Sequence, residues 1–433
     1  MNGLLNNLNG GRYAKETIKY LLRSKWTIRK YIREVEELYS MDARTLRERN
    51  SKRFVSLFRK AYDRSPFYRQ LYMEAGIRRD DIQGIEDIEK LPIVTKEMIR
   101  HRTEEVRTTS RGGLVTNHTS GTTGTPLTVY EDWPALWREQ AYFVAYRRRC
   151  GYEYGQPIVS LRGNLGKKDT YLKVHVSNTL YLSSYNINES TIRTYYEQII
   201  RHKPIAIEGY PSSLYALSLQ LRDANLTLSI PVAFTSSETL LDSQRALIER
   251  QLGTQIYDHY GTTERTIRLS ELPDHSGYYE DPGYSINEYR EDGVITTSLI
   301  NESFPLIRYK VDDIIETEEG TDGKVKVTGI KGRSEDFVVC KDGTHVMRLG
   351  FIMKRTHNIK ASQLVQRRPG HLLMKIVPDK EYSKADEEAV MKSLDERVGK
   401  GNMDITIEMT TMDGLEYSKS GKFKYIINDI GKT

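Results

Sequence analysis

The sequence predicts an α/β protein with a large N-terminal domain, which includes β-rich parts, and a small mobile α+β domain at the C-terminal end. Three observations favour this fold class. The 433 residues exceed the length of one ordinary domain. Short apolar runs alternate with amphipathic segments between residues 156 and 265, and strand-like segments dominate after residue 288. Because strands that alternate with helices form parallel sheets covered by helices, we expect the middle of the chain to be the α/β core.

The first 110 residues are expected to be helical. Apolar side chains recur at helical spacing from Leu46 to Tyr72, and Thr95 is the expected N-cap of a short helix. The segment from Met1 to Trp26 has no long apolar run, and no later segment is long and apolar enough to span a bilayer. We therefore expect a cytoplasmic protein without stable membrane insertion.

Composition excludes several classes of protein. The chain has two cysteines, Cys150 and Cys340, which can form neither a disulfide framework nor a cysteine-rich zinc site. The formal charge is +6, and basic runs such as Arg147–Arg149 and Arg367-Arg368 are expected to be solvated faces. No zinc-finger spacing or aromatic RNA-binding signature is present, so nucleic acid is not an expected partner.

The α/β core is predicted to place polar segments along one edge of its sheet. Its expected strands are 157–161, 205–207, 232–235 and 255–257, and its expected helices are 189–202, 212–222 and 240–252. The segments Glu208–Ser213, Ser236–Thr239 and Asp258–Glu264 each follow a strand directly. Any one of them could be an ordinary turn. Three together predict a site, because open α/β folds bind ligands at the carboxyl ends of their strands.

The rest of the chain predicts more strands and then the small domain. Expected strands are 294–299, 306–317, 324–328, 337–340, 372–377 and 405–409, and a helix over 383–398 begins with a capping box of Ser383 and Asp386. The charged segment Gly332–Asp336 is the expected hinge. The predicted domains are 1–334, with its helical start, a loop at 119–126, the core at 156–265 and a β-rich part at 288–334, and 335–433.

The segment Thr119–Pro126 is rich in Gly, Ser and Thr and lies between two β-like segments, 114–117 and 127–130. Such a loop lets backbone N–H groups approach phosphate oxygens closely. It is not a Walker A loop, because no Gly-Lys-Ser/Thr follows at the required spacing. By itself it fits a polar hairpin turn equally well.

Five segments in order resemble the core motifs of the acyl-adenylate-forming superfamily, which contains acyl-CoA synthetases, luciferases and peptide-synthetase adenylation domains. They are 119–126, Tyr260–Glu264, Arg308–Asp313, Gly332–Asp336 and Ser420–Lys422. Within that superfamily, Pro66-Phe67-Tyr68 and Ile307-Arg308-Tyr309 resemble the phenylacetate–CoA ligase-like branch. The turn Gly209–Ser213 and the compact length are similar to its subgroup found with capsular-polysaccharide biosynthesis.

The resemblance implies an ATP-dependent, AMP-forming enzyme that activates a carboxylic acid as its acyl-adenylate. Two anions must meet in that reaction, so positioning and charge neutralisation are the catalytic needs. The implied catalytic residues are Lys422, Thr263 and Glu264, of which Glu264 would hold Mg²⁺, and Glu335 is the implied hinge residue. The implied nucleotide contacts are Thr119, Ser120, Gly121, Thr122, Thr123, Gly124, Ser236, Ser237, Glu238, Asp258, Tyr260, Gly261, Thr262, Asp313 and Arg333.

Some positions depart from the family pattern. Thr125 stands where many relatives have Lys, and Asp312 replaces the usual Gly before the ribose-binding Asp313. Some relatives have a Cys/His zinc insert after the glutamate motif, but Leu272 and His275 occupy that region here without cysteine, so no zinc is expected.

The acyl acceptor and the acid are left open. CoA is the expected co-substrate, and the alternative is an amide- or ester-forming ligase that acts on an amino sugar, an amine or a carrier protein. A non-catalytic nucleotide-binding module is disfavoured because Glu264, Asp313 and Lys422 are all present. Aromatic residues after the phosphate loop and at the sheet edge are the candidates for the acyl pocket: Trp137, Tyr142, Tyr146 and Tyr210.

Overall fold

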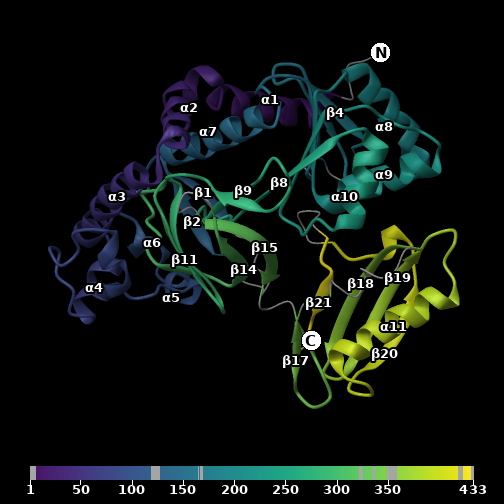
Figure 1. The fold of residues 1–433 in the computed structure, drawn as a ribbon. Helices are drawn as coiled ribbons and strands as arrows, with labels where there is room; N and C mark the ends of the chain where they lie inside the picture. Colours follow the sequence, from purple (N-terminus) through teal and green to yellow (C-terminus); the bar gives the residue numbers. More distant parts are fainter. Residues whose placement is uncertain are drawn as a thin grey trace.

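The computed structural model describes residues 6–118, 127–163, 165, 169–320, 325–333, 337–347, 349, 358–417 and 423–430. The larger part of the chain is built on an extended mixed sheet, and the C-terminal residues form a smaller α+β unit beside it (Figure 1). This arrangement confirms the α/β fold class. No helix of the described segments combines the length and the apolarity needed to cross a membrane.

The large sheet combines a parallel centre with antiparallel edges. Within the described residues its strand order is β14-β15-β10-β9-β8-β7-β6-β3-β5-β4, and the pairs β3/β5, β3/β6, β6/β7 and β7/β8 are parallel. The strands are β3 (Ile158–Leu161), β4 (Tyr171–Val174), β5 (Thr179–Leu182), β6 (Ala206–Gly209), β7 (Val232–Ser236), β8 (Gln255–Gly261), β9 (Arg268–Glu271), β10 (Tyr278–Glu280), β14 (Asp313–Glu319) and β15 (Val325–Arg333).

Helices cover both faces of the parallel centre. The helices α8 (Glu189–His202), α9 (Pro211–Asp223) and α10 (Asp242–Leu252) pack on one face through a buried aliphatic cluster that includes Val159, Ile207 and Ala233. The helix α7 (Trp133–Arg149) packs on the other face, where Tyr146 meets Phe234. Parallel sheets are usually covered by helices on both faces, so their strands are buried on both sides.

Local sequence signals explain where these helices begin and end. Asn188 caps α8 with a capping box. Gly253 ends α10 at φ +56°, and a Cβ there would lie 2.9 Å from the carbonyl oxygen of Leu228. Glycine is therefore required at this turn by both conformation and space.

Four of the N-terminal helices pack around a second, smaller sheet through a shared buried cluster. They are α3 (Ala43–Arg64), α4 (Pro66–Glu74), α5 (Lys96–Arg100) and α6 (Thr103–Val106), and the antiparallel strands are β11 (Ser285–Arg290), β12 (Gly293–Ser298) and β13 (Tyr309–Val311). The two helices before them are α1 (Asn6–Leu22) and α2 (Lys25–Ser40), of which α2 packs on α7. Thr95 caps α5 as expected. A separate antiparallel pair, β1 (Val115–His118) and β2 (Thr128–Glu131), forms a stem on either side of the predicted phosphate loop.

The C-terminal unit has its own buried cluster, formed by residues between Val338 and Ile426. Its four-stranded sheet has the order β20-β19-β18-β21 and is packed by α11 (Lys384–Val398). The strands are β18 (Ile359–Arg368), β19 (His371–Pro378), β20 (Asp404–Met409) and β21 (Ile426–Asn428), and a hairpin of β16 (Phe337–Val339) and β17 (His345–Met347) precedes them. The capping box of Ser383 and Asp386 is present at the start of α11.

Two expectations about strands were wrong. The single strand expected over 306–317 is two strands, β13 and β14, which belong to different sheets. The strand expected to end at Tyr257 continues to Gly261, because β9 pairs with its last three residues in an antiparallel register. Asp258 and Tyr260 therefore lie within the sheet and not in a loop after it.

Candidate active site

The predicted nucleotide motif forms the end of β8 and the turn that follows it. Thr262 Oγ1 accepts from the backbone N–H of Thr266 at 3.2 Å, which closes the turn. Thr263 is exposed and Glu264 is half-buried, so both side chains reach the surface of this edge. The Tyr309 hydroxyl donates to Glu264 Oε1 at 3.4 Å.

The segment predicted to bind ribose meets β8 from β14, a strand at the edge of the large sheet. The hydroxyl of Tyr260 donates to the carboxylate of Asp313, the first residue of β14. The strand register places Arg333 directly opposite Asp313. Asp312 is exposed by comparison. The fold thus brings together Tyr260, Asp313 and Arg333, which are far apart in the sequence.

Arg265 ties the turn to the stem of the phosphate loop. It lies at φ +55°, and its guanidinium forms ion pairs with Glu131 at the end of β2 and, at 3.1 Å, with Glu139 of α7. Glu131 also accepts from Asn117 on β1. Burial lowers the pKa of Arg265, but Glu139 and Glu131 outweigh it and raise the pKa overall. Arg265 therefore holds both stem strands against the Thr262–Glu264 turn.

The loop itself, 119–126, lies outside the described residues, as do Glu335 and Lys422. The neighbour of Lys422 is described. The backbone N–H of Phe423 donates to Glu238 Oε1 at 2.6 Å, and Glu238 Oε2 accepts from the backbone N–H of Ser212 at 3.0 Å. Tyr417 and Phe423 form an antiparallel bridge. Both ends of the segment that contains Lys422 are thus held at the same edge of the sheet as the nucleotide motif.

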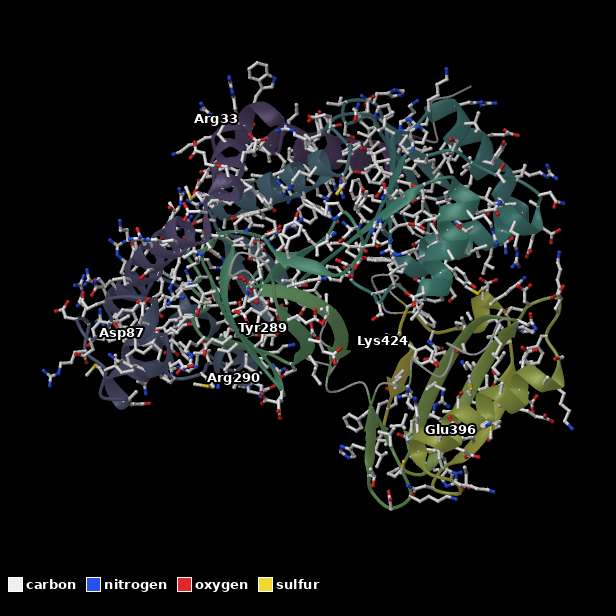
Figure 2. All side chains as sticks on the ribbon, in the orientation of Figure 1. Arg33, Asp87, Tyr289, Arg290, Glu396 and Lys424 are labelled. Carbon is white, nitrogen blue, oxygen red and sulfur yellow. The ribbon has the colours of Figure 1, made fainter. Side chains whose placement is uncertain are left out.

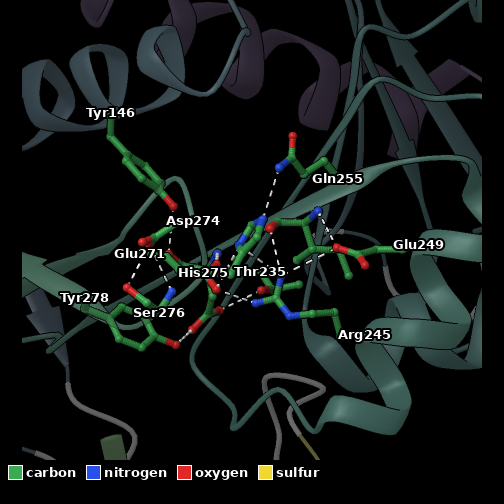
Figure 3. A network of polar contacts seen from close by, with 12 residues as sticks. Tyr146, Thr235, Arg245, Glu249, Gln255, Glu271, Asp274, His275, Ser276 and Tyr278 are labelled. Carbon is green, nitrogen blue, oxygen red and sulfur yellow. Dashed lines mark hydrogen bonds and ion pairs between the residues drawn. The ribbon is translucent and has the colours of Figure 1, made fainter. Parts of the chain in front are cut away.

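Asp258, a predicted adenine contact, is a buried residue. It accepts from Thr235 at 2.6 Å and from Tyr278 at 2.8 Å. Burial raises the pKa of Asp258 to about 6, although these hydrogen bonds oppose the rise. Figure 3 shows Thr235 and Tyr278 in this network together with Glu271 and Arg245, whose ion pair spans 2.5 Å. Any adenine contact of Asp258 would have to share carboxylate oxygens that already accept these bonds.

The residues at the ends of β3, β6 and β7 form a charged cluster that sequence reasoning missed. Glu208 is paired with Arg147, accepts from Ser160 Oγ at 2.9 Å, and lies 3.9 Å from Arg162. Arg162 also donates to Ser236 Oγ. Burial alone would raise the pKa of Glu208, but the two guanidinium groups outweigh it and lower the pKa to about 2.

The run Arg147–Arg149 was expected to be a solvated face, and for Arg147 this was wrong. Arg148 and Arg149 are exposed, but the helical turn points Arg147 at the sheet, where it lies over Phe234 and pairs with Glu208. The only signal in the sequence was that Glu208 follows a strand directly.

The four acyl-pocket candidates do not come together. Trp137 donates through Nε1 to the carbonyl of Leu22, and Tyr142 donates to the carbonyl of Pro282, so both pack away from the sheet edge. Tyr146 is buried against the sheet and donates to the backbone oxygen of Asp258 at 2.7 Å. Tyr210 lies at the edge itself, at the start of α9.

A hard cation at this edge of the sheet would take most of its ligands from the bound nucleotide and from water. Among the described residues no group of three or more His, Cys, Asp and Glu is arranged to hold a metal ion. Mg²⁺ binds through one or two protein carboxylates together with phosphate oxygens and waters. The half-buried carboxylate of Glu264 fits that requirement, and the next residue, Arg265, is fixed by its ion pair with Glu131 at the end of β2.

Comparison with known proteins agrees with this geometry. Residues 338–429 match the family model described as CapK C-terminal domain. The chain is 23% identical to "Protein CapK" of Staphylococcus aureus over 95% of both chains. It is 26% identical to a phenylacetate-coenzyme A ligase of Pseudomonas putida, over 70% of this chain and 74% of the relative.

Solved structures share the fold. A 2-hydroxyisobutyryl-CoA ligase in its postadenylation state, in complex with an acyl-AMP, superposes with a TM-score of 0.70 at 16% identity, over 90% of this chain and 91% of the other. The same ligase in its thioesterification state gives a TM-score of 0.53. Together these likenesses support the resemblance to the acyl-adenylate-forming superfamily of AMP-forming ligases, its phenylacetate–CoA ligase-like branch and its CapK-type subgroup.

Proposed function

We propose that this protein activates a carboxylic acid with ATP as an acyl-adenylate and then transfers the acyl group to the thiol of CoA. The observation that supports it most is the meeting of three distant segments at one sheet edge. The turn 260–264, Asp313 and the backbone of Phe423 converge there through Tyr260 and Glu238. These segments meet at the carboxyl ends of the parallel strands. Open α/β folds bind their ligands at that end of the sheet.

In the first half-reaction the substrate carboxylate attacks the α-phosphorus of ATP and pyrophosphate leaves. Asp313 and Arg333 would hold the ribose, Tyr260 would face the adenine, and Thr263 would donate to the α-phosphate. Glu264 would hold Mg²⁺, which when bound neutralises phosphate oxygens. Lys422 would place its ammonium between the two anions, where water is excluded and Coulomb terms are large.

In the second half-reaction the thiol attacks the acyl carbon, AMP leaves and the thiol proton is released. We propose that residues 335–433 rotate about Glu335 between the two steps, relative to residues 1–334. The separate buried cluster of residues 338–426 supports this division. The present arrangement, in which Glu238 holds Phe423, belongs to the first step, and the higher TM-score with the postadenylation state supports that assignment.

The cluster at Glu208 supports a narrower proposal about the acid. Two half-buried guanidinium groups, those of Arg147 and Arg162, share the carboxylate of Glu208. The Arg162 guanidinium donates to Ser236 and can donate further. Because a guanidinium group with further donors forms strong, charge-assisted hydrogen bonds with an anionic oxygen, the cluster favours an acid that brings a second anionic group.

The test is a panel of carboxylic acids incubated with ATP, Mg²⁺ and the full chain, with pyrophosphate, AMP and ADP all measured. We expect AMP and pyrophosphate, and formation of ADP instead would refute adenylation. CoA is then compared with amines, amino sugars and carrier-protein thiols as acceptors, which decides between thioester and amide or ester formation.

The narrower proposal is tested by pairing each monocarboxylic acid with its dicarboxylic analogue. We expect a preference for the dicarboxylate of about ten- to a hundredfold in kcat/KM, the scale of one charge-assisted hydrogen bond. Arg162→Gln should remove the preference, whereas Arg148→Gln, at an exposed arginine of α7, should keep it. An equal preference in both variants would refute the role of Arg162 and leave adenylation itself standing.

A further inference from the structure

The positive charge of the chain is concentrated at its N-terminal helices. Residues 12–33 contain eight Lys and Arg side chains and one Glu, a formal charge of +7, whereas the whole chain carries +6. The remainder is therefore close to neutral. A charge distribution this uneven is the footprint of an anionic partner.

Exposed apolar side chains gather in the same place. Among the described residues eleven large apolar side chains are exposed, and four of them fall between residues 18 and 26. They are Ile18, Leu21, Leu22 and Trp26, with exposed fractions of 57%, 55%, 39% and 85%. The other seven are scattered singly over the chain, which needs no explanation.

The helix geometry places apolar and basic groups on one solvent face. Trp26, Arg29, Lys30 and Arg33 follow the spacing i, i+3, i+4, i+7 on α2, and all are exposed. The opposite face of α2 is buried against α7 through residues that include Ile28 and Val35. Among the described residues, no ion pair involves Arg29, Lys30 or Arg33.

The preceding helix extends this face. Ile18, Leu21 and Leu22 share one side of α1, and Lys15 and Lys19 are exposed beside them. The other side of α1 packs on the body of the protein, where Tyr20 stacks on Tyr154 at 5.5 Å. We call the exposed side of residues 15–33 the N-terminal surface.

We propose that the N-terminal surface docks the enzyme on an anionic lipid bilayer. A helix face that combines Trp and Leu with Lys and Arg lies in the interface plane, with its apolar groups among the headgroups and acyl chains. The long basic side chains then reach the lipid phosphates while their stems stay in the apolar layer. A nucleic acid would pair with the basic side chains but leave the four apolar side chains in water. A second copy of the chain, docked through the same surface, would place two positively charged surfaces against each other.

The position of this surface leaves the active site accessible. Figure 1 shows α1 and α2 along one margin of the molecule with α7 beneath them, and the C-terminal unit at the opposite side. Figure 2 shows Arg33 at that margin, pointing away from the body. Docking through this surface therefore does not obstruct rotation of the C-terminal unit.

The proposal is tested by sedimenting the full chain with vesicles of phosphatidylcholine alone and of phosphatidylcholine with phosphatidylglycerol. We expect binding to the anionic vesicles, weakened by added salt because the attraction between exposed charges is screened. The triple variant Arg29→Gln, Lys30→Gln and Arg33→Gln, which removes three positive charges, should lower the partition coefficient roughly a hundredfold, at about fivefold for each basic group. Trp26→Ala should lower it by about tenfold, through the lost apolar burial.

Two controls separate a specific surface from general stickiness. Met73→Ala removes another exposed apolar side chain, and Lys392→Glu reverses an exposed charge on α11; neither should change vesicle binding. Equal binding to neutral and anionic vesicles, no binding to either, or equal losses in the control variants would overturn the proposal. So would a stable dimer that Trp26→Ala dissociates, or binding to duplex DNA that Trp26→Ala leaves unchanged while vesicles are ignored.

Discussion

The link between Glu238 and the lysine segment makes a specific prediction about the first half-reaction. Glu238 accepts from the backbone N–H of Phe423 at 2.6 Å and from that of Ser212 at 3.0 Å. In Glu238→Gln the oxygen that remains is neutral, and the new amide N–H₂ group faces one of the two backbone donors. The attachment of Phe423, the residue that follows Lys422 in the sequence, should therefore become weaker.

The magnitude follows from the kind of hydrogen bond that is lost. A hydrogen bond to a charged group contributes about 1.5 to 3 kcal/mol, which corresponds to a factor of about ten to a hundred. Glu238 is half-buried, so solvent screening favours the lower end. We expect adenylation, measured as pyrophosphate release at saturating ATP, to slow about tenfold.

A double-mutant cycle separates this effect from direct nucleotide contact. If Glu238 acts by holding the lysine segment, Glu238→Gln should add less than about a twofold effect in a Lys422→Ala background. Glu416→Gln is the matched control. Glu416 is an exposed carboxylate of the C-terminal unit, which also contains Phe423, and it pairs with Lys375 at 3.3 Å. A tenfold loss of the same size in both backgrounds would refute the reasoning.

The remaining predictions concern the two half-reactions, the ribose contact and pH. Lys422→Ala should lower adenylation by roughly a hundredfold to a thousandfold and leave transfer from a synthetic acyl-adenylate nearly unchanged; equal damage to both steps would contradict the division of labour. Asp313→Ala should raise the KM for ATP far more than Asp312→Ala, since Tyr260 contacts Asp313; the reverse order would show that the motif register is wrong. Glu208→Gln should destabilise the fold at pH 7, because it removes the carboxylate that pairs with two half-buried guanidinium groups. The pKa of Glu208 is lowered in the fold to about 2, so this stability is present above the ordinary carboxyl pKa and is lost as pH falls from about 5 towards 2. Denaturation of both proteins across that range should show the difference shrinking, and a constant difference would refute the ion-pair account.

Much of the fold was readable from the sequence because its signals are local. The helix expected over 189–202 is α8 with the same bounds, and the capping residues Thr95 and Ser383 are where they were expected. Caps and apolar periodicity depend on residues within one or two turns of each other. The order of the five family motifs is likewise a property of the linear sequence, and the comparisons support the resemblance that it predicted.

The strand ends were less predictable because they depend on which neighbouring strand each residue pairs with. β8 continues to Gly261 because β9 pairs with its last three residues. The segment expected as one strand over 306–317 divides because its two halves have different partners, β12 and β15. A strand ends where its neighbour ends, and the neighbour is not encoded in the strand's own residues.

The side-chain partners at the active site were decided by tertiary structure alone. Arg147 pairs with Glu208, 61 residues away, and Phe423 meets Glu238, 185 residues away. Which face of α7 meets the sheet is set by packing of the whole helix, so the exposed pattern of Arg147–Arg149 could not show that one arginine points inward. The sequence by itself determined which chemical groups are present and in what order. Only the packing of helices on both faces of the sheet decided which of those groups meet, because contacts between distant residues depend on the rotation and position of entire elements.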